Sequence, residues 1–340
     1  SFFVNAGVRF VEEMCKMRAF VELWEEITRD RYGVVDERQR RFRYGVQVNS
    51  LGLSETQPEN NVQRIVLELL AVTLSKDARA RAIQLPAWNE ALGLPRPWDQ
   101  QWSLRIQQVL AYETDLLEYD DIFTGSTVVE AEVARMVDQA RTEMAIVEDM
   151  GGAVAAVDNG YMKGQMVASH SQRRADIESG DHVIVGVNKF TTSEPNPLLA
   201  DIDTAIQSVA PEVEAAATAS LMDWRMSRDD DAVTAALVEL SRAADGQENL
   251  MVPTLQCARV GVTTGEWSSA LRAVFGEYRA PTGLSGVVGV QSGSSDLTQV
   301  RELVQATGAE LGVRLRFLVG KPGLDGHSNG AEQIAVRARD

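Results

Sequence analysis

Apolar residues near the beginning of the chain recur with two different spacings, one typical of helices and one typical of strands. Residues 8–33 carry apolar side chains every three or four positions, which predicts an amphipathic helix that ends at Gly33. Residues 41–50 instead alternate apolar and polar side chains, which predicts a strand. A second apolar helix over 59–76 and a short strand over 80–85 follow. Strands and helices that alternate through short connections indicate a parallel α/β arrangement.

The pattern turns largely helical over residues 98–180. The clearest helix ends at Gly151 and Gly152, which are typical C-cap residues. An apolar run at 181–190 predicts a strand-like segment, and residues 201–276 are again expected to be helical.

A second α/β domain is predicted near the end of the chain. Residues 280–296 are rich in Gly and Ser and predict a linker, because such residues do not anchor a core. A helix over 297–312 and a strand over 314–320 follow, and a glycine-rich loop leads into the start of another helix. The predicted parts are a first α/β domain, a mainly helical connecting region, the linker and the beginning of the second domain, over 1–150, 151–279, 280–296 and 297–340.

Composition narrows the class of protein. The 340 residues include 44% hydrophobic and 24% charged residues, as in an ordinary globular protein. The net charge of −16 argues against nonspecific binding to nucleic acid, and no apolar run predicts a membrane span. Cys15 and Cys257 lie far apart, which argues against a disulfide framework and fits the cytoplasm. The first residue is not Met and no leader is evident, so we expect the chain to begin inside a longer protein.

The loop "KPGLDGHSNG" at 321–330 carries the most specific chemistry in the sequence. Asp325 and His327 lie two residues apart, and Gly330 precedes a predicted helix start. A neutral imidazole is a good ligand for a transition metal, and a carboxylate on its other nitrogen fixes the tautomer. Glycines let the backbone approach a flat ligand closely. Taken alone, the motif is as compatible with an ordinary Asp-Gly turn that carries a solvated histidine as it is with a metal ligand.

Several runs together carry a family resemblance. They are "FVEEMCKMRAFVELW", "RYGVQVNSLGLSETQPENNVQRI", "NEALGLP", "DHVIVGVNKF" and "KPGLDGHSNGA". This set resembles the adenosylcobalamin-dependent acyl-CoA mutases, the methylmalonyl-CoA mutase family. The resemblance implies an α/β fold: the C-terminal part of a (β/α)8 TIM barrel over 1–150, the helical connecting region, and the truncated start of a flavodoxin-like cobalamin-binding domain. It also implies a dimer when full length.

The resemblance assigns the cofactor loop residue by residue. His327 corresponds to the axial ligand of the cobalt, and Asp325 to its hydrogen-bonded partner. Lys321 corresponds to a member of the same network and Gly330 to a close-packing glycine. The implied cofactor is therefore adenosylcobalamin.

Four residues of the first domain are candidates for binding the acyl-CoA substrate. Arg43 and Gln47 lie four apart on one predicted strand, so their side chains share a face. The Arg43 charge and the Gln47 amide are expected to hold the thioester or the CoA part of the substrate. An ion pair at the strand end is the alternative for Arg43. Arg81 suits a CoA phosphate, with a solvated basic turn as its alternative. Glu113 is assigned by the resemblance alone, to a region that faces the cofactor or the substrate.

The implied activity is a radical isomerisation, an intramolecular transfer that converts (2R)-ethylmalonyl-CoA to (2S)-methylsuccinyl-CoA. Methylmalonyl-CoA as the substrate is the first alternative, and a non-catalytic cobalamin-binding or scaffold module is the second. Gly45 replaces a His and Arg81 a Gln of the methylmalonyl-CoA mutases, at positions expected near the C-terminal ends of barrel strands. The smaller Gly45 is expected to admit a bulkier acyl branch.

The resemblance also bears on the 340 residues taken alone. It places the catalytic Tyr and His of the family before Ser1 and most of the cobalamin-binding domain after Asp340. We therefore expect this polypeptide by itself to be unstable, to turn over no substrate and to bind cobalamin weakly.

Overall fold

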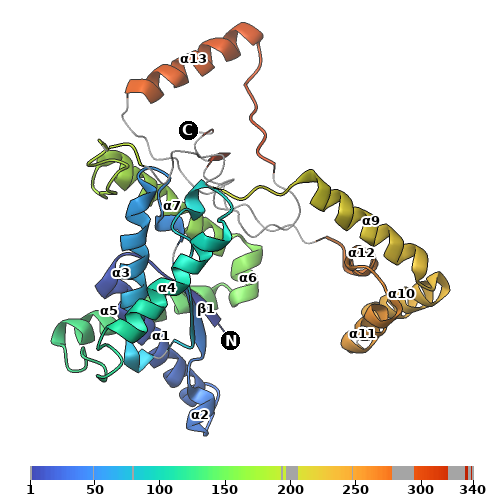
Figure 1. The fold of residues 1–340 in the computed structure, drawn as a ribbon, viewed down its shortest axis with the longest axis horizontal. Helices are drawn as coiled ribbons and strands as arrows, with labels where there is room; N and C mark the ends of the chain where they lie inside the picture. The colour runs from blue at the N-terminus through green and yellow to red at the C-terminus, as the bar shows by residue number, and fades with distance from the viewer. Residues whose placement is uncertain are drawn as a thin grey trace. The chain divides into compact units, whose positions relative to one another are not determined.

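The computed structural model shows a mixed α/β chain that is mostly helical, with one small parallel sheet (Figure 1). Its contacts divide the chain into two compact units, one within residues 1–207 and 281–340 and the other within 208–280. The structure describes residues 2–48, 50–78, 80–192, 194–196, 206–246, 248–277, 295–320, 334–335 and 338.

The sheet of the first unit has three parallel strands. They are β1 (Phe2–Ala6), β2 (Tyr44–Val48) and β3 (Ala82–Gln84), and β2 is the central one. The strands predicted at 41–50 and 80–85 and their parallel arrangement are thus confirmed. Each strand is short because its apolar alternation lasts for only a few residues.

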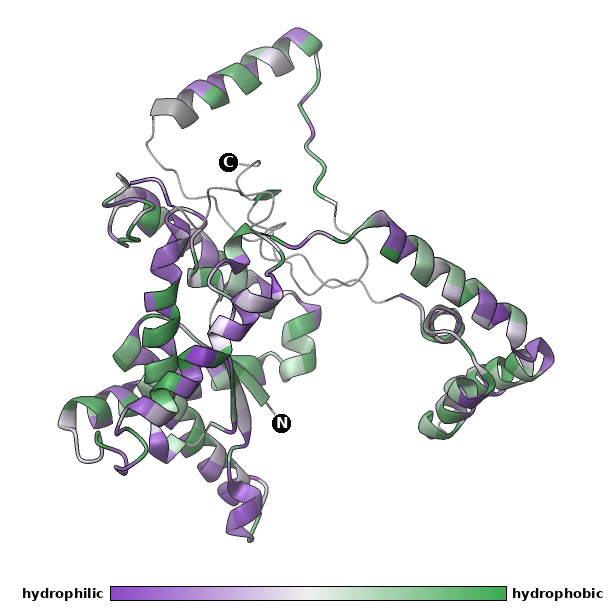
Figure 2. Ribbon diagram, in the orientation of Figure 1, coloured by the Kyte–Doolittle hydropathy of each residue, from purple (hydrophilic) through white to green (hydrophobic). Residues whose placement is uncertain are grey.

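Two helices cover one face of this sheet. The helix α1 (Phe10–Asp30) lies between β1 and β2 in sequence, and α3 (Asn61–Thr73) lies between β2 and β3, as the periodicity predicted. Tyr44 and Val46 are buried against Met17 of α1 and Val72 of α3. Figure 2 shows β1 as a largely hydrophobic strand. Burial of these side chains fixes which face of each strand turns toward the helices.

Further helices extend this core away from the sheet. The helix α5 (Thr127–Asp149) packs on α1 through Val129, Val133 and Val137. The helix α4 (Pro97–Glu113) packs beside the buried Trp88. The remaining elements in the described residues of the first unit are α2 (Glu37–Arg40), α6 (Ala153–Asp158), α7 (Tyr161–Ser179), α13 (Ser295–Leu311), η1 (Ser50–Gly52), η2 (Pro58–Asn60), η3 (Lys76–Ala78) and η4 (Glu90–Leu92).

Glycines end the helices where the sequence predicted. Gly33 lies just beyond α1 and has φ +63°, and Gly151 and Gly152 beyond α5 have φ +99° and +98°. These left-handed conformations suit glycine and stop helix propagation. The helix predicted over 297–312 is also confirmed, as α13.

The strand-like segment expected at 181–190 is a turn, and that expectation was wrong. The only ladder contact within this segment is an isolated bridge between Val185 and Lys189. The Asn188 side chain accepts a hydrogen bond from the Ile184 N–H (2.7 Å) and donates to the His182 carbonyl (2.8 Å). These local bonds satisfy the backbone in place of a neighbouring strand.

The strand expected at 314–320 is likewise not formed. Residues 314–320 belong to no strand, and almost all of them are exposed. No strand in the described part of the chain pairs with this segment, and a strand without a partner leaves its N–H and C=O groups unsatisfied.

The second unit consists of four helices in its described residues. They are α9 (Pro211–Ser227), α10 (Asp230–Asp245), α11 (Met251–Val260) and α12 (Thr264–Phe275), which confirms the helical prediction beyond residue 210. Residues 206–210 are not helical. Leu240 and Cys257 form the centre of this unit.

Cys15 and Cys257 are both buried and free, in agreement with the predicted lack of a disulfide framework. Among the residues that the structure describes, no helix is both long and apolar enough to cross a membrane.

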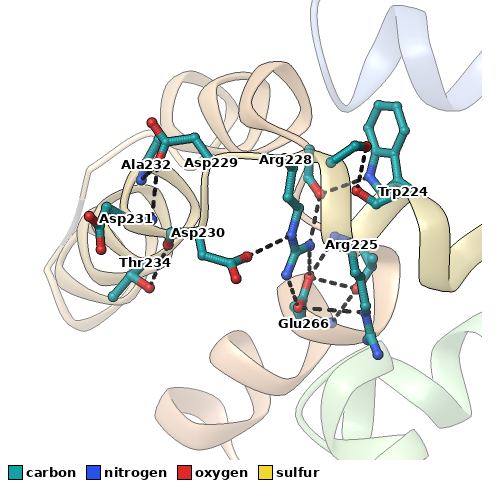
Figure 3. A network of polar contacts seen from close by, with 12 residues as sticks. Trp224, Arg225, Arg228, Asp229, Asp230, Asp231, Ala232, Thr234 and Glu266 are labelled. Atoms are coloured by element: carbon teal, nitrogen blue, oxygen red, sulfur yellow. Dashed lines mark hydrogen bonds and ion pairs between the residues drawn. The ribbon is translucent and has the colours of Figure 1, made fainter.

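An ion pair connects the end of α9 to the start of α12 (Figure 3). The Arg228 guanidinium donates to both carboxylate oxygens of Glu266 (2.6 and 2.7 Å) and to the Gly261 carbonyl (2.9 Å). The Thr263 N–H donates to Glu266 as well, in a capping box. The hydrogen bond from Arg228 is the main reason that the pKa of Glu266 lies far below its ordinary value of 4.5.

Replacing Glu266 should therefore loosen the second unit. In the full-length protein we expect Glu266→Gln to speed amide exchange in α12 by about tenfold at pH 7, because a charge-assisted pair is lost. The lowered pKa means that the pair stabilises the fold above pH 4.5 and weakens progressively below it. Hydrogen exchange followed by mass spectrometry measures this effect.

The matched control is Glu239→Gln. Glu239 pairs with Arg242 in the same unit, but both side chains are more than half exposed, at 53% and 54%. Such surface pairs contribute little, so exchange in α10 should stay unchanged. Equal effects of the two substitutions would contradict the assigned role of Glu266.

Candidate functional site

The face of the sheet that α1 and α3 leave uncovered carries a distinct set of side chains. Alternation along the strands places Phe3, Asn5, Gly45, Gln47, Ala82 and Gln84 on this side, which we call the open face. All of them except Gly45 are exposed, whereas their neighbours Tyr44, Val46 and Val48 are buried.

Three amides form a row across the open face. Asn5 of β1 pairs in register with Gln47 of β2, which pairs in turn with Gln84 of β3. Neighbouring strands lie about 4.8 Å apart, so the row spans about 10 Å. Each amide offers both donors and acceptors to a ligand. We call these three residues the amide row.

Only one member of this row was predicted as a binding residue. Gln47 was predicted as a binding residue, whereas Asn5 and Gln84 were not. The alternation in "FFVNA" and "AIQ" indicates which strand face Asn5 and Gln84 belong to. Their alignment with Gln47 depends on strand register, which these short runs do not specify.

Lys16 fixes the orientation of Asn5. Its ammonium group, on α1, donates to the Asn5 carbonyl (2.8 Å) and contacts the side-chain oxygen Oδ1 (3.4 Å). Lys16 also forms an ion pair with Glu13. The Lys16 contact occupies one acceptor position of the Asn5 oxygen, and the Asn5 NH2 group can donate to a ligand.

Gly45 lies directly beneath an aromatic ring. A Cβ atom at this position would lie 2.8 Å from Cζ of Phe3 and 2.9 Å from its Cε1. Phe3, Gly45 and Ala82 form the row next to the amide row. The glycine therefore leaves room for the end of the Phe3 ring.

The expected location of Gly45 and Arg81 needs correction. Gly45 is the second residue of β2, and Arg81 immediately precedes β3, so both lie toward the amino ends of the strands. The Arg81 N–H donates to the Tyr44 carbonyl (2.9 Å), which sets where the β2–β3 ladder begins. Gln47, the fourth residue of β2, lies nearer to the carboxyl ends of the strands than Gly45 and Arg81 do.

The other substrate candidates lie outside the strands. Arg43 precedes β2, and its exposed guanidinium donates to the Arg38 carbonyl (3.1 Å). It thus lies with Arg81, also exposed, at the amino ends of neighbouring strands. Glu113 is the exposed last residue of α4, a helix rather than the sheet.

The predicted cofactor loop lies outside the described residues. This applies to Lys321, Asp325, His327 and Gly330, whose roles stay predictions. In the part of the chain that the structure describes, no three His, Cys, Asp or Glu residues are arranged to hold a metal ion.

Glu68 is an unusual acid on the opposite side of the sheet. It lies on α3 and is fully buried. Neither of its carboxylate oxygens has a hydrogen-bond partner among the described residues. Burial, with a smaller contribution from Glu13, raises the pKa of Glu68 to about 8, and Arg64 opposes the shift. Glu68 is therefore mostly neutral at pH 7.

Comparison with known proteins agrees with this arrangement. Residues 1–277 match the family described as methylmalonyl-CoA mutase. The chain belongs to the methylmalonyl-CoA mutase family. Two of the runs that suggested this family, at 10–24 and 43–65, contribute to α1, β2 and the start of α3.

Individual members of the family differ in their similarity to the chain. It is 61% identical over 340 residues to the ethylmalonyl-CoA mutase of Cereibacter sphaeroides and 59% identical to that of Methylorubrum extorquens. It is 34% identical over 343 aligned residues to the methylmalonyl-CoA mutase of Cereibacter sphaeroides. All of the chain is covered in each case, but only 51%, 49% and 47% of these relatives. The chain thus spans about half the length of the curated relatives it matches.

Glu68→Gln should stabilise the full-length protein. The pKa of Glu68 is higher in the folded state than its ordinary value of 4.5, so folding takes up a proton. The wild-type free energy of unfolding should therefore fall as pH rises from 4.5 to about 8. The neutral glutamine avoids this loss, with a gain of roughly 2–3 kcal/mol at pH 7. Urea unfolding at several pH values measures it.

Glu22→Gln serves as the control, because Glu22 is exposed on α1. We expect it to leave the unfolding midpoint and its pH dependence near those of the wild type. A Glu68→Gln variant that is less stable than the wild type at pH 8 would show that the ionised acid is needed.

Proposed function

We propose that the full-length protein is an adenosylcobalamin-dependent isomerase, an intramolecular transferase, that converts (2R)-ethylmalonyl-CoA to (2S)-methylsuccinyl-CoA. The observation that carries this proposal is the contrast in identity within one family. Two ethylmalonyl-CoA mutases are 61% and 59% identical to the whole chain, against 34% for a methylmalonyl-CoA mutase.

The fold proposed for the full-length protein is a TIM barrel followed by a flavodoxin-like domain. Three parallel strands, each joined to the next through a helix on the same face, are what a segment of such a barrel looks like. In a closed barrel the open face would turn inward, and its exposed polar side chains would line the site. A cytoplasmic dimer is part of the same proposal.

Substrate binding is proposed at the amide row and at the amino ends of β2 and β3. The amide row suits a thioester carbonyl, an acceptor that Gln47 and its neighbours can hold through N–H donors. Arg43 and Arg81 suit the anionic part of CoA, because guanidinium groups pair well with phosphates. Glu113 completes the proposed set of substrate-binding residues.

The cofactor would be held by the loop at 321–330. His327 would bind the cobalt, Asp325 and Lys321 would support it, and Gly330 would allow close approach. When bound, adenosylcobalamin supplies the radical chemistry, and the protein supplies binding, orientation and exclusion of water.

Turnover by the full-length protein tests the function. With adenosylcobalamin present, we expect kcat/KM for ethylmalonyl-CoA to exceed that for methylmalonyl-CoA by about tenfold or more, a difference typical of one methylene in a fitted pocket. Chromatographic separation of the isomeric acyl-CoAs, with detection by mass spectrometry, measures both reactions. A preference for methylmalonyl-CoA would reassign the substrate, and no turnover of either would favour a binding or scaffold role.

His327→Ala tests the metal ligand independently of turnover. In full-length protein labelled with 15N-histidine and loaded with cob(II)alamin, the electron paramagnetic resonance spectrum should show coupling to a protein nitrogen. His327→Ala should abolish this coupling, because the imidazole is gone. His170→Ala on α7 is the control and should retain it. Unchanged coupling in His327→Ala would refute the assignment.

A further inference from the structure

Two adjacent phenylalanines at the beginning of the chain have opposite surroundings. Phe2 turns toward the helices, where its ring centroid lies 5.0 Å from that of Trp24 and 5.1 Å from that of Phe42. Phe3 belongs to the open face and is 67% exposed. Because Phe3 lies on the same face as the amide row, its ring would turn toward the barrel interior under the proposed function.

The Phe3 ring and Gly45 form one unit. Gly45 is buried although it lies on the open face, because the ring of Phe3 lies across it. Ring atoms occupy the space that a Cβ at Gly45 would need, at 2.8 and 2.9 Å. Any side chain at residue 45 would therefore move the ring.

The ring also lies beside the amide row. Phe3 and Asn5 are two residues apart on β1, which corresponds to about 7 Å along the strand. An apolar wall thus adjoins a row of amide groups. A branched acyl thioester has matching parts, an alkyl branch and a carbonyl acceptor on neighbouring atoms.

We propose that Phe3 is a specificity-determining residue, whose ring over Gly45 is the wall against which the alkyl branch of the acyl-CoA packs. This inference rests on the proposed function and deepens it, since it names the group that distinguishes an ethyl from a methyl branch. The two substrates differ by one methylene, and burial of one methylene against a ring discriminates between them by roughly tenfold.

The main test substitutes Phe3 in the full-length protein. The measured quantity is the ratio of kcat/KM for ethylmalonyl-CoA to that for methylmalonyl-CoA. Phe3→Ala should lower this ratio by about tenfold and Phe3→Leu by less, because leucine keeps part of the wall. Both substrates are assayed on one preparation, so the fraction of active enzyme cancels.

A double-mutant cycle tests the coupling between Phe3 and Gly45. Gly45→Ala should change the ratio in the wild-type background, because its methyl group displaces the ring. In the Phe3→Ala background the same substitution should change it by less than about twofold, because no ring is left to displace.

Binding supplies a readout that does not need the cofactor. Isothermal titration calorimetry of the cofactor-free full-length protein gives Kd for each acyl-CoA. The preference for the ethyl-branched ligand should fall in Phe3→Ala in the same direction as the kinetic ratio.

Phe2→Leu is the matched control, the same kind of substitution one residue away on the helix-covered face. It should leave the substrate ratio unchanged, even where it lowers stability. A ratio within about twofold of the wild type in Phe3→Ala would overturn this inference while the proposed function stands. Absence of turnover by the wild type would overturn both.

Discussion

Burial of one face of a three-stranded parallel sheet is the constraint on which the first unit depends. Side chains alternate along a strand, so burial of Tyr44 and Val46 under α1 and α3 leaves Gly45 and Gln47 on the other side. The same packing turns Asn5 outward. Hydrophobic packing behind the sheet thereby positions the polar groups in front of it, and a shift of one residue would exchange the two sets.

The helix α1 shows how one element serves several neighbours at once. Cys15 faces α5, Lys16 reaches Asn5, and Met17 packs on the sheet. Successive helical residues point about 100° apart, so adjacent positions serve different partners. This arrangement leaves Glu13 near Glu68, whose pKa is raised mainly by burial and to a smaller extent by Glu13. The site and the stability of its support are therefore linked through a single helix.

The sequence allowed most of the helices and the alternation of the strand at 41–50 to be predicted, because period and alternation are local properties. Local pattern could not give the register that aligns Asn5 with Gln84, nor the strand ends that place Gly45 near the amino end of β2. It also failed at 181–190, where Asn188 satisfies the backbone instead of a ladder. His327 came from its motif and stays a prediction, since it lies outside the described residues.

The sheet has a direction that suits an elongated ligand with unlike ends. Arg43 and Arg81 lie at the amino ends of β2 and β3, whereas the amide row lies toward the carboxyl ends. Arg43 and Gln47 are four residues apart, or about 13 Å along the strand. In an acyl-CoA the phosphates and the thioester are likewise well separated. Under the proposed function, the charge of Arg43 and Arg81 would therefore orient the substrate along the sheet, with its phosphates toward the amino ends of the strands.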